Sequence, residues 1–428
     1  MSEAESYIFK AIMILVFMWI NIRGVRDVGI ITNILSIFVI VAFAMIAIIG
    51  FTHWGGNPFE PITAYPIEAG SDWIFYIGSG IAIGMWMYSG YESMSTIAGE
   101  LEDPQVIPKA TLITVPLIMA TYILPTMAGL SAFKTEGDSF SFLNWGSEAA
   151  DVGYASVATH FIGPAFGIFF GIVAIIAQCS IYNTYIASGS RGFFALADDN
   201  LAPKMLVKVD KKHGVPYISV ISVAVVNLIL CILPFKTVVV VDVFLLVSSY
   251  ILVYISAMIL RKRIPASDYK FKIPGGYGFL CVLCVVPMCI AFISFLINGS
   301  DYFIGGMIGI ISGPILYYIW KRMYGGLAAK NPESSPVNPR TKLAVGDLNR
   351  VAIMFGILTV IGIAGSLFLP WYEVDWAFPD DYDMTLFSSQ SAMFFGIKIA
   401  TIVVGALTVL FAILGRTIDS AKSKAKAS

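Results

Sequence analysis

Long apolar segments separated by short polar ones dominate the chain. Eleven of them are read as membrane spans, because a bilayer core of about 30 Å needs about 20 mostly apolar residues in a helix. They cover residues 7–21, 30–51, 73–98, 111–133, 163–187, 217–233, 238–260, 279–297, 302–320, 351–371 and 393–415. The pattern predicts an all-α polytopic membrane protein that crosses the lipid bilayer about 11 times.

Composition agrees with this interpretation. Hydrophobic residues make up 57% of the 428 residues and charged residues only 13%, and the mean hydropathy is +0.81. Soluble domains carry about 25% charged residues. The formal net charge of -1 says little, because in membrane proteins the placement of charge matters and the total does not. Nucleic acid is not expected as a partner of such a protein.

Basic residues gather on one side of the predicted membrane. If the loop at Arg23 and Arg26 is cytoplasmic, alternation of the spans places 23 of the 27 lysines and arginines on that side, as the positive-inside rule requires. The C-terminus is then cytoplasmic and Met1 external, in a multi-pass protein of the cell membrane. Acidic residues fall on the opposite face: Glu60, Glu68, Asp72, Glu136, Asp138, Glu148, Asp151, Glu373, Asp375, Asp380, Asp381 and Asp383.

One predicted span contains a break. Ser89, Gly90, Tyr91 and Glu92 interrupt the apolar run 73–98, and an ionisable residue at membrane depth is a functional-site hypothesis by default. Gly90 allows the helix to unwind, which frees amides for a substrate carboxylate and carbonyls for a cation. Glu92 is the candidate for binding a substrate ammonium or a coupling proton. The structural alternative is that glycine and serine only pack helices closely.

Aromatic and polar side chains extend this candidate substrate site. Trp86 and Tyr91 offer large faces on which a cationic substrate could stack. The span 163–187 and its continuation carry Asn183 and Tyr185 among a dense set of polar residues, which favours a face turned toward a cavity. Hydrogen bonding between helices is the alternative reading of the same residues.

No metal or cofactor site is expected. Cys281 and Cys284 have CxxC spacing but lack the second pair of ligands that a zinc site needs, and His53, His160 and His213 are scattered. No nucleophile or paired intramembrane carboxylate favours an enzyme.

Four stretches together resemble the amino acid permeases of the amino acid, polyamine and organocation (APC) superfamily. In chain order they are NIRGVRDVG from Asn21, WMYSGYESMSTIAGELEDPQVIPKA from Trp86, SRGFFALADDNLAPKMLVKVDKKHGVP from Ser190, and LRKRIPASDYKFKIPGG from Leu260. In that family they join helices four and five, form the broken sixth helix and its loop, and follow helices eight and ten. The resemblance covers about residues 7–322.

The resemblance implies a LeuT-like core of two inverted five-helix repeats, with substrate held between broken helices one and six. The chain then starts at helix four, so the expected core is N-terminally incomplete and two helices are added at the C-terminus. Trp86 matches an aromatic gate position and Tyr185 a substrate-contacting aromatic. Some members use a lysine of helix five as proton site, where this chain has Val39. Exchange, proton coupling through Glu92 and sodium coupling all stay open.

The expected organisation has four parts. Residues 1–322 form the permease core, 323–350 a flexible cytoplasmic polar linker, 351–415 two additional spans around an acidic external loop, and 416–428 a basic cytoplasmic tail. The expected function is secondary transport of an amino acid or a polyamine. The alternative is a non-transporting subunit that needs a partner to supply helices one to three.

Overall fold

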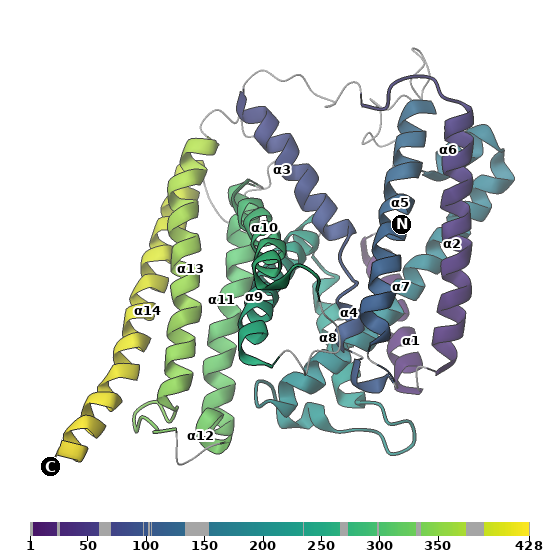
Figure 1. The fold of residues 1–428 in the computed structure, drawn as a ribbon. Coiled ribbons are helices and arrows are strands. Elements are labelled where there is room, and N and C mark those ends of the chain that lie inside the picture. The colour runs from purple at the N-terminus through teal and green to yellow at the C-terminus, as the bar shows by residue number, and fades with distance from the viewer. Residues whose placement is uncertain are drawn as a thin grey trace. The chain divides into compact units, whose positions relative to one another are not determined.

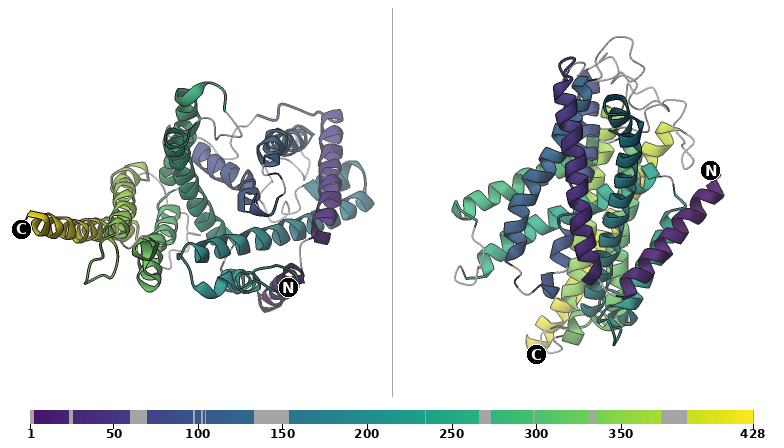
Figure 2. Two further views of the ribbon diagram at one scale, coloured as in Figure 1. Left: turned by 60° about the horizontal axis from the view of Figure 1, so that its bottom comes forward. Right: turned by 90° about the vertical axis from the view of Figure 1, so that its right-hand side faces the viewer.

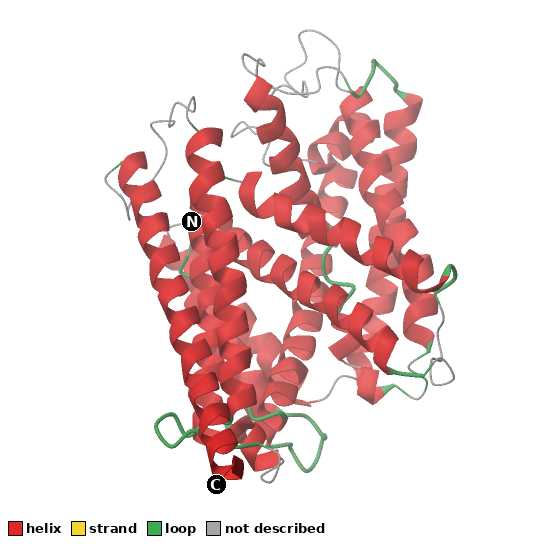
Figure 3. Ribbon diagram, turned by 60° about the vertical axis from the view of Figure 1, so that its left-hand side comes forward, coloured by secondary structure: helices red, strands yellow, loops and turns green. Residues whose placement is uncertain are grey.

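A computed structural model describes residues 3–23, 26–59, 70–96, 98–101, 103, 105–132, 154–233, 235–265, 273–297, 299–330, 335–373 and 389–427. Nearly all of these residues are helical (Figure 3). The helices are α1 Glu3–Arg23, α2 Arg26–Thr52, α3 Gly70–Met87, α4 Ser93–Thr96, α5 Val106–Ala132, α6 Tyr154–Phe161, α7 Pro164–Asp198, α8 Tyr217–Leu230, α9 Phe235–Arg263, α10 Gly276–Ile297, α11 Ser300–Tyr324, α12 Gly326–Lys330, α13 Val345–Tyr372 and α14 Gln390–Ala427.

The predicted all-α polytopic architecture is confirmed. Each predicted span has a helix, except that the span 73–98 is divided between α3 and the short α4. Within the described ranges, 8 helices are long and apolar enough to cross a membrane, and residues 36–52 and 217–230 form shorter apolar helices. Most of the acidic loop residues that were expected outside, in 60–68, 136–151 and 375–383, lie outside the described residues.

The chain divides into two compact units. Unit 1 contains Met1–Glu68, Tyr88–Phe194 and Lys208–Ile229, and unit 2 contains Ala69–Met87, Ala195–Val207 and Leu230–Ser428. The division passes between α3 and the break that follows it.

Two packing contacts organise unit 1. Helices α2 and α5 lie side by side, with Gly50 of α2 directly against the backbone of Ala128. Helix α1, whose start carries the N label, is inclined to α2 (Figure 2, right) and packs with α7 and α8 around the buried residues Ile186, Val215 and Val220. Small residues allow such close approach of helices in a membrane.

Aromatic side chains form the core of unit 2. Phe244 of α9 packs on Phe295 of α10, with ring centroids 4.3 Å apart, and on Phe303 of α11 at 6.2 Å. Gly306 of α11 and Gly365 of α13 lie directly against Phe244 and Phe303, so neither glycine has room for a side chain. Helices α9, α10, α11 and α13 therefore form one apolar core.

Helices α13 and α14 form an antiparallel hairpin and run alongside each other (Figure 1). Both ends of α13 carry a buried carboxylate. Asp347 accepts the Tyr317 hydroxyl at 2.8 Å and the Leu327 N–H at 2.8 Å. These bonds tie the start of α13 to α11 and α12.

Glu373 differs from its expected place on a solvated outer surface. It is 2% exposed and accepts both the backbone N–H and the hydroxyl of Ser300, each at 2.6 Å. The first turn of a helix has unsatisfied N–H groups that favour a negative charge, and Glu373 supplies it to α11. A count of charges could not distinguish this buried cap from a surface acid.

Part of the predicted polar linker is hydrogen-bonded. Val337 and Ala344 form an antiparallel bridge, the Asn338 N–H donates to the Leu343 carbonyl at 2.8 Å, and the Asn338 side chain donates to the Leu414 carbonyl at 3.3 Å. This segment is thus hydrogen-bonded within itself and to Leu414 of α14; its proline, serine and charge content had suggested a flexible connection.

Candidate functional site

The interruption expected at Ser89–Glu92 is present. Helix α3 ends at Met87, the chain is non-helical from Tyr88 to Glu92, and α4 begins at Ser93. Gly90 adopts φ +108°, a conformation that side-chain-bearing residues rarely adopt. Tyr88 packs edge-on against Tyr122 of α5, with ring centroids 5.2 Å apart. A glycine at this position thus permits the turn, and an aromatic contact fixes where the turn begins.

Glu92 folds back onto the break. The Gly90 N–H donates to both carboxylate oxygens of Glu92, at 2.9 and 3.1 Å. The Gly90 carbonyl accepts the Ser93 N–H at 3.1 Å, and the Glu92 carbonyl accepts the Ser95 N–H at 2.9 Å. The amide that the sequence assigned to a substrate carboxylate therefore already holds a carboxylate of the protein itself.

Tyr185 reaches the same point from α7. Its hydroxyl lies 2.8 Å from where a side chain on Gly90 would begin, and the residue is 44% exposed. Tyr91, 40% exposed, follows Gly90 directly. The structure therefore places both the Glu92 carboxylate and the Tyr185 hydroxyl at Gly90, with Tyr91 next to Gly90 in the chain.

Asn183 is not part of this group. It is 4% exposed, and its Oδ1 accepts the side-chain N–H of Asn21 in α1 at 2.6 Å. Residues two apart on a helix point to roughly opposite sides, so Asn183 faces α1 while Tyr185 faces Gly90. The polar density of α7 favoured a face turned toward a cavity, with hydrogen bonding between helices as the alternative. Asn183 follows the alternative, because it bonds to α1.

Two further predicted residues lie beside the break. Ser89 is half-buried and immediately precedes Gly90. Trp86 lies in the last turn of α3, in unit 2, whereas the residues around Gly90 belong to unit 1. Sequence reasoning missed Asn21, and the available signal was an amide residue at the end of an otherwise apolar run.

The role predicted for this group is that of a cation site centred on the Glu92 carboxylate. A carboxylate carries two oxygens with about four lone-pair sites, and both oxygens of Glu92 accept the Gly90 N–H. An ammonium could bind there, with aromatic faces to contact its methylene chain and its charge. Among the described residues, no group of three or more His, Cys, Asp or Glu side chains is placed to hold a metal ion.

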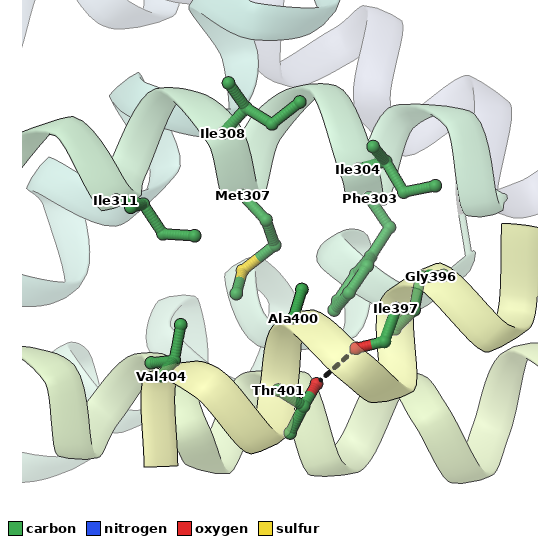
Figure 4. Close-up of a pocket in the computed structure, with 10 residues that line it drawn as sticks. All are labelled: Phe303, Ile304, Met307, Ile308, Ile311, Gly396, Ile397, Ala400, Thr401 and Val404. Carbon is green, nitrogen blue, oxygen red and sulfur yellow. Dashed lines mark hydrogen bonds between the residues drawn. The ribbon is translucent and has the colours of Figure 1, made fainter. Parts of the chain in front are cut away.

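A separate groove lies in unit 2 between α11 and α14, with a volume of about 210 Å³ (Figure 4). Its lining is aliphatic and aromatic apart from Thr401, whose hydroxyl donates to the Ile397 carbonyl of its own helix at 2.8 Å. Nothing charged lines it. The groove suits hydrocarbon and not a charged metabolite.

Comparison with known proteins identifies relatives with transport functions. A probable polyamine transporter of Arabidopsis thaliana is 24% identical over 278 residues, which are 64% of this chain and 52% of that protein. The polyamine transporter PUT1 of Oryza sativa subsp. japonica is 22% identical over 269 residues, 63% of this chain and 47% of that protein.

The aromatic amino acid transport protein AroP of Salmonella typhimurium is 31% identical over 229 residues, 51% of this chain and 48% of that protein. The chain thus spans about half the length of the curated relatives it matches. The sequence model of the family described as amino acid permease matches residues 2–319. The matched region contains the break at Gly90 and every residue gathered around it, and the chain belongs to the amino acid permease family.

Proposed function

We propose that the protein is a secondary transporter that moves small organic cations, polyamines first among them, across the cell membrane by alternating access. The observation that carries the proposal is the Glu92 carboxylate on the Gly90 amide, 2.9 Å away, beside Tyr91 and the Tyr185 hydroxyl. The names of the plant relatives support a polyamine as substrate. The C-terminus is placed in the cytoplasm, as the distribution of basic residues favours.

The position of Glu92 favours an amine over an amino acid. Two unit charges about 4 Å apart interact by about 4 kcal/mol at an effective dielectric constant of about 20. An ammonium near Glu92 gains energy of this order, whereas a substrate carboxylate is repelled by a similar amount. An amino acid would also compete with Glu92 for the Gly90 amide. A polyamine has no carboxylate, so it is not repelled by Glu92 and does not compete with Glu92 for the Gly90 amide.

Glu92 also supports a coupling mechanism. A single carboxylate binds either an ammonium or a proton, so substrate and proton compete for it. Release of the cation on one side and protonation of Glu92 before the return step give exchange of a cation for a proton. The unwound turn at Gly90 supplies the flexible point that such a movement needs, since hinges are a few residues that absorb large changes in φ and ψ.

A second candidate is transport of aromatic amino acids. It is favoured by the 31% identity to AroP and by the exposed aromatic residues beside the break.

Uptake by reconstituted protein distinguishes the two candidates. Proteoliposomes are given radiolabelled putrescine or radiolabelled phenylalanine, and each uptake is challenged with an excess of the other compound. The proposal expects uptake of putrescine that spermidine inhibits and phenylalanine does not. Uptake of phenylalanine alone would transfer the conclusion to the second candidate, and uptake of neither would refute transport by this chain.

A further inference from the structure

The first matching stretch, NIRGVRDVG, begins with a residue whose role the transport site does not explain. Asn21 lies near the end of α1 and is 1% exposed. Its side-chain N–H group donates to the Phe17 carbonyl at 2.9 Å and to Asn183 Oδ1 at 2.6 Å. Its own side-chain oxygen is buried and has no hydrogen-bond partner in the described part of the chain.

The surroundings of this pair are apolar. Ile186, Val215 and Val220 form a buried cluster there, and Phe17 and Ile22 of α1 pack against it. A hydrogen bond between helices adds modest stability in a membrane, and a buried carbonyl without a partner costs free energy of comparable size. Stability alone therefore does not account for an amide pair at this position.

The amide pair of Asn21 and Asn183 can instead specify the rotation of α7 about its own axis. A single buried polar residue in an apolar interface can fix register and partner, because any other arrangement leaves its polar groups unpaired. Asn183 and Tyr185 are two residues apart, which is about 200° around a helix of 3.6 residues per turn. Holding Asn183 against Asn21 therefore turns Tyr185 toward the other side of α7, where its hydroxyl lies at Gly90.

Two other polar residues of α7 make contacts with different partners. Arg191 donates to the Ala187 carbonyl and to the Ser190 hydroxyl, both within α7. Asn227 of α8 donates to the Tyr182 hydroxyl at 3.1 Å, which fixes α7 against α8. The bond between Asn21 and Asn183 joins the side chains of α1 and α7 directly.

We propose that Asn21 and Asn183 are a positioning pair: their hydrogen bond sets the rotation of α7 and thereby presents Tyr185 to the broken helix at Gly90. The role rests on the proposed function, in which Tyr185 helps to form the site. A rotation of α7 by one residue, about 100°, removes Asn183 from α1 and Tyr185 from Gly90 together.

The first test follows the orientation of α7 and needs no transport. The five native cysteines are replaced by alanine, and single cysteines are placed by Tyr185→Cys or Ser188→Cys. N-ethylmaleimide should label position 185, which is 44% exposed, several-fold faster than position 188, which is 7% exposed. Adding Asn21→Leu together with Asn183→Leu should reduce this ratio toward one. An unchanged ratio overturns the proposal.

The second test measures function in the native-cysteine protein. Replacing both asparagines by leucine removes donor and acceptor together, a change that is often nearly neutral for stability. We expect the melting temperature to be retained and the KM for putrescine to rise roughly tenfold, the factor that corresponds to about 1.4 kcal/mol, with Vmax within about twofold. Adding Tyr185→Phe should then have little further effect, because the hydroxyl has already left the site.

The control variant is Ile186→Leu, which directly follows Tyr185 on α7 and carries no polar side-chain group. It should leave both the labelling ratio and KM unchanged. A lower melting temperature with an unchanged KM in the double variant would assign the pair a purely structural role and overturn the proposal. If the unaltered protein takes up no substrate, transport fails as a function, and the labelling ratio still decides the rotation of α7.

Discussion

Substitution of Gly90 by alanine perturbs the break with the smallest possible side chain. At φ +108° a non-glycine residue stores about 1–3 kcal/mol of backbone strain. The new Cβ would also lie 2.8 Å from the Tyr185 hydroxyl, so that hydroxyl must move, at a further cost of about 1 kcal/mol for the lost contact. The total is about 2–4 kcal/mol against the observed conformation.

This free energy translates into uptake through the population of the competent conformation. At about 1.4 kcal/mol per factor of ten, the fraction of protein with the observed break falls roughly 30- to 700-fold. The assay is initial uptake of radiolabelled putrescine by proteoliposomes, normalised to the amount of protein inserted. Gly90→Ala should lower uptake at subsaturating substrate by at least tenfold.

The matched control is Gly192→Ala in α7. Nothing lies within 4 Å of a Cβ at this position, and alanine is more favourable than glycine inside a helix by about 0.5–1 kcal/mol. Uptake by this variant should stay within about twofold of the unaltered protein. Uptake by Gly90→Ala that also stays within twofold would refute the argument that the unwound turn at Gly90 forms the site.

Two further predictions concern the stability of unit 2. Glu373→Gln weakens the two 2.6 Å bonds to Ser300 and should lower the melting temperature, since a buried hydrogen bond to a charged group contributes about 1.5–3 kcal/mol. The control Asp198→Asn, at an exposed position, should change the melting temperature little; an equal decrease in the two variants would contradict the capping role of Glu373. Gly306→Leu places a side chain against the Phe244 ring, and overpacking of about 1–3 kcal/mol should lower the melting temperature and the yield of folded protein; a melting temperature equal to that of the unaltered protein would show that α9 and α11 are not in the contact described.

The sequence predicted the elements of this fold well because apolar length and helix-breaking residues act locally. Gly90 interrupts the apolar run by its own conformational freedom, so the end of α3 could be expected within a few residues. The direction of a polar side chain is a tertiary property. Asn183 and Tyr185 have the same polarity signal, and only the contact of α7 with α1 decides which of them faces the break.

The burial of a charged residue is likewise a tertiary property that the sequence did not predict. Glu373 and the acids predicted in the outer loops are identical in a charge count. Glu373, however, caps the start of α11, where the first N–H groups of a helix have no partner within it. Asn21 was missed because one amide in an apolar helix gives no periodic pattern. Its partner lies 162 positions away, and no local signal connects the two.

The central claim is that the Glu92 carboxylate at the Gly90 break binds the transported cation. The most direct measurement compares putrescine uptake by Glu92→Gln with uptake by Asp210→Asn, each reconstituted in proteoliposomes at equal amounts. Asp210 is the matched control because its carboxylate also accepts nearby backbone N–H groups, those of Lys212 and His213 at 3.1 and 2.9 Å. The account predicts that Glu92→Gln abolishes uptake while Asp210→Asn retains it; uptake by Glu92→Gln equal to that of the control at every pH would contradict it.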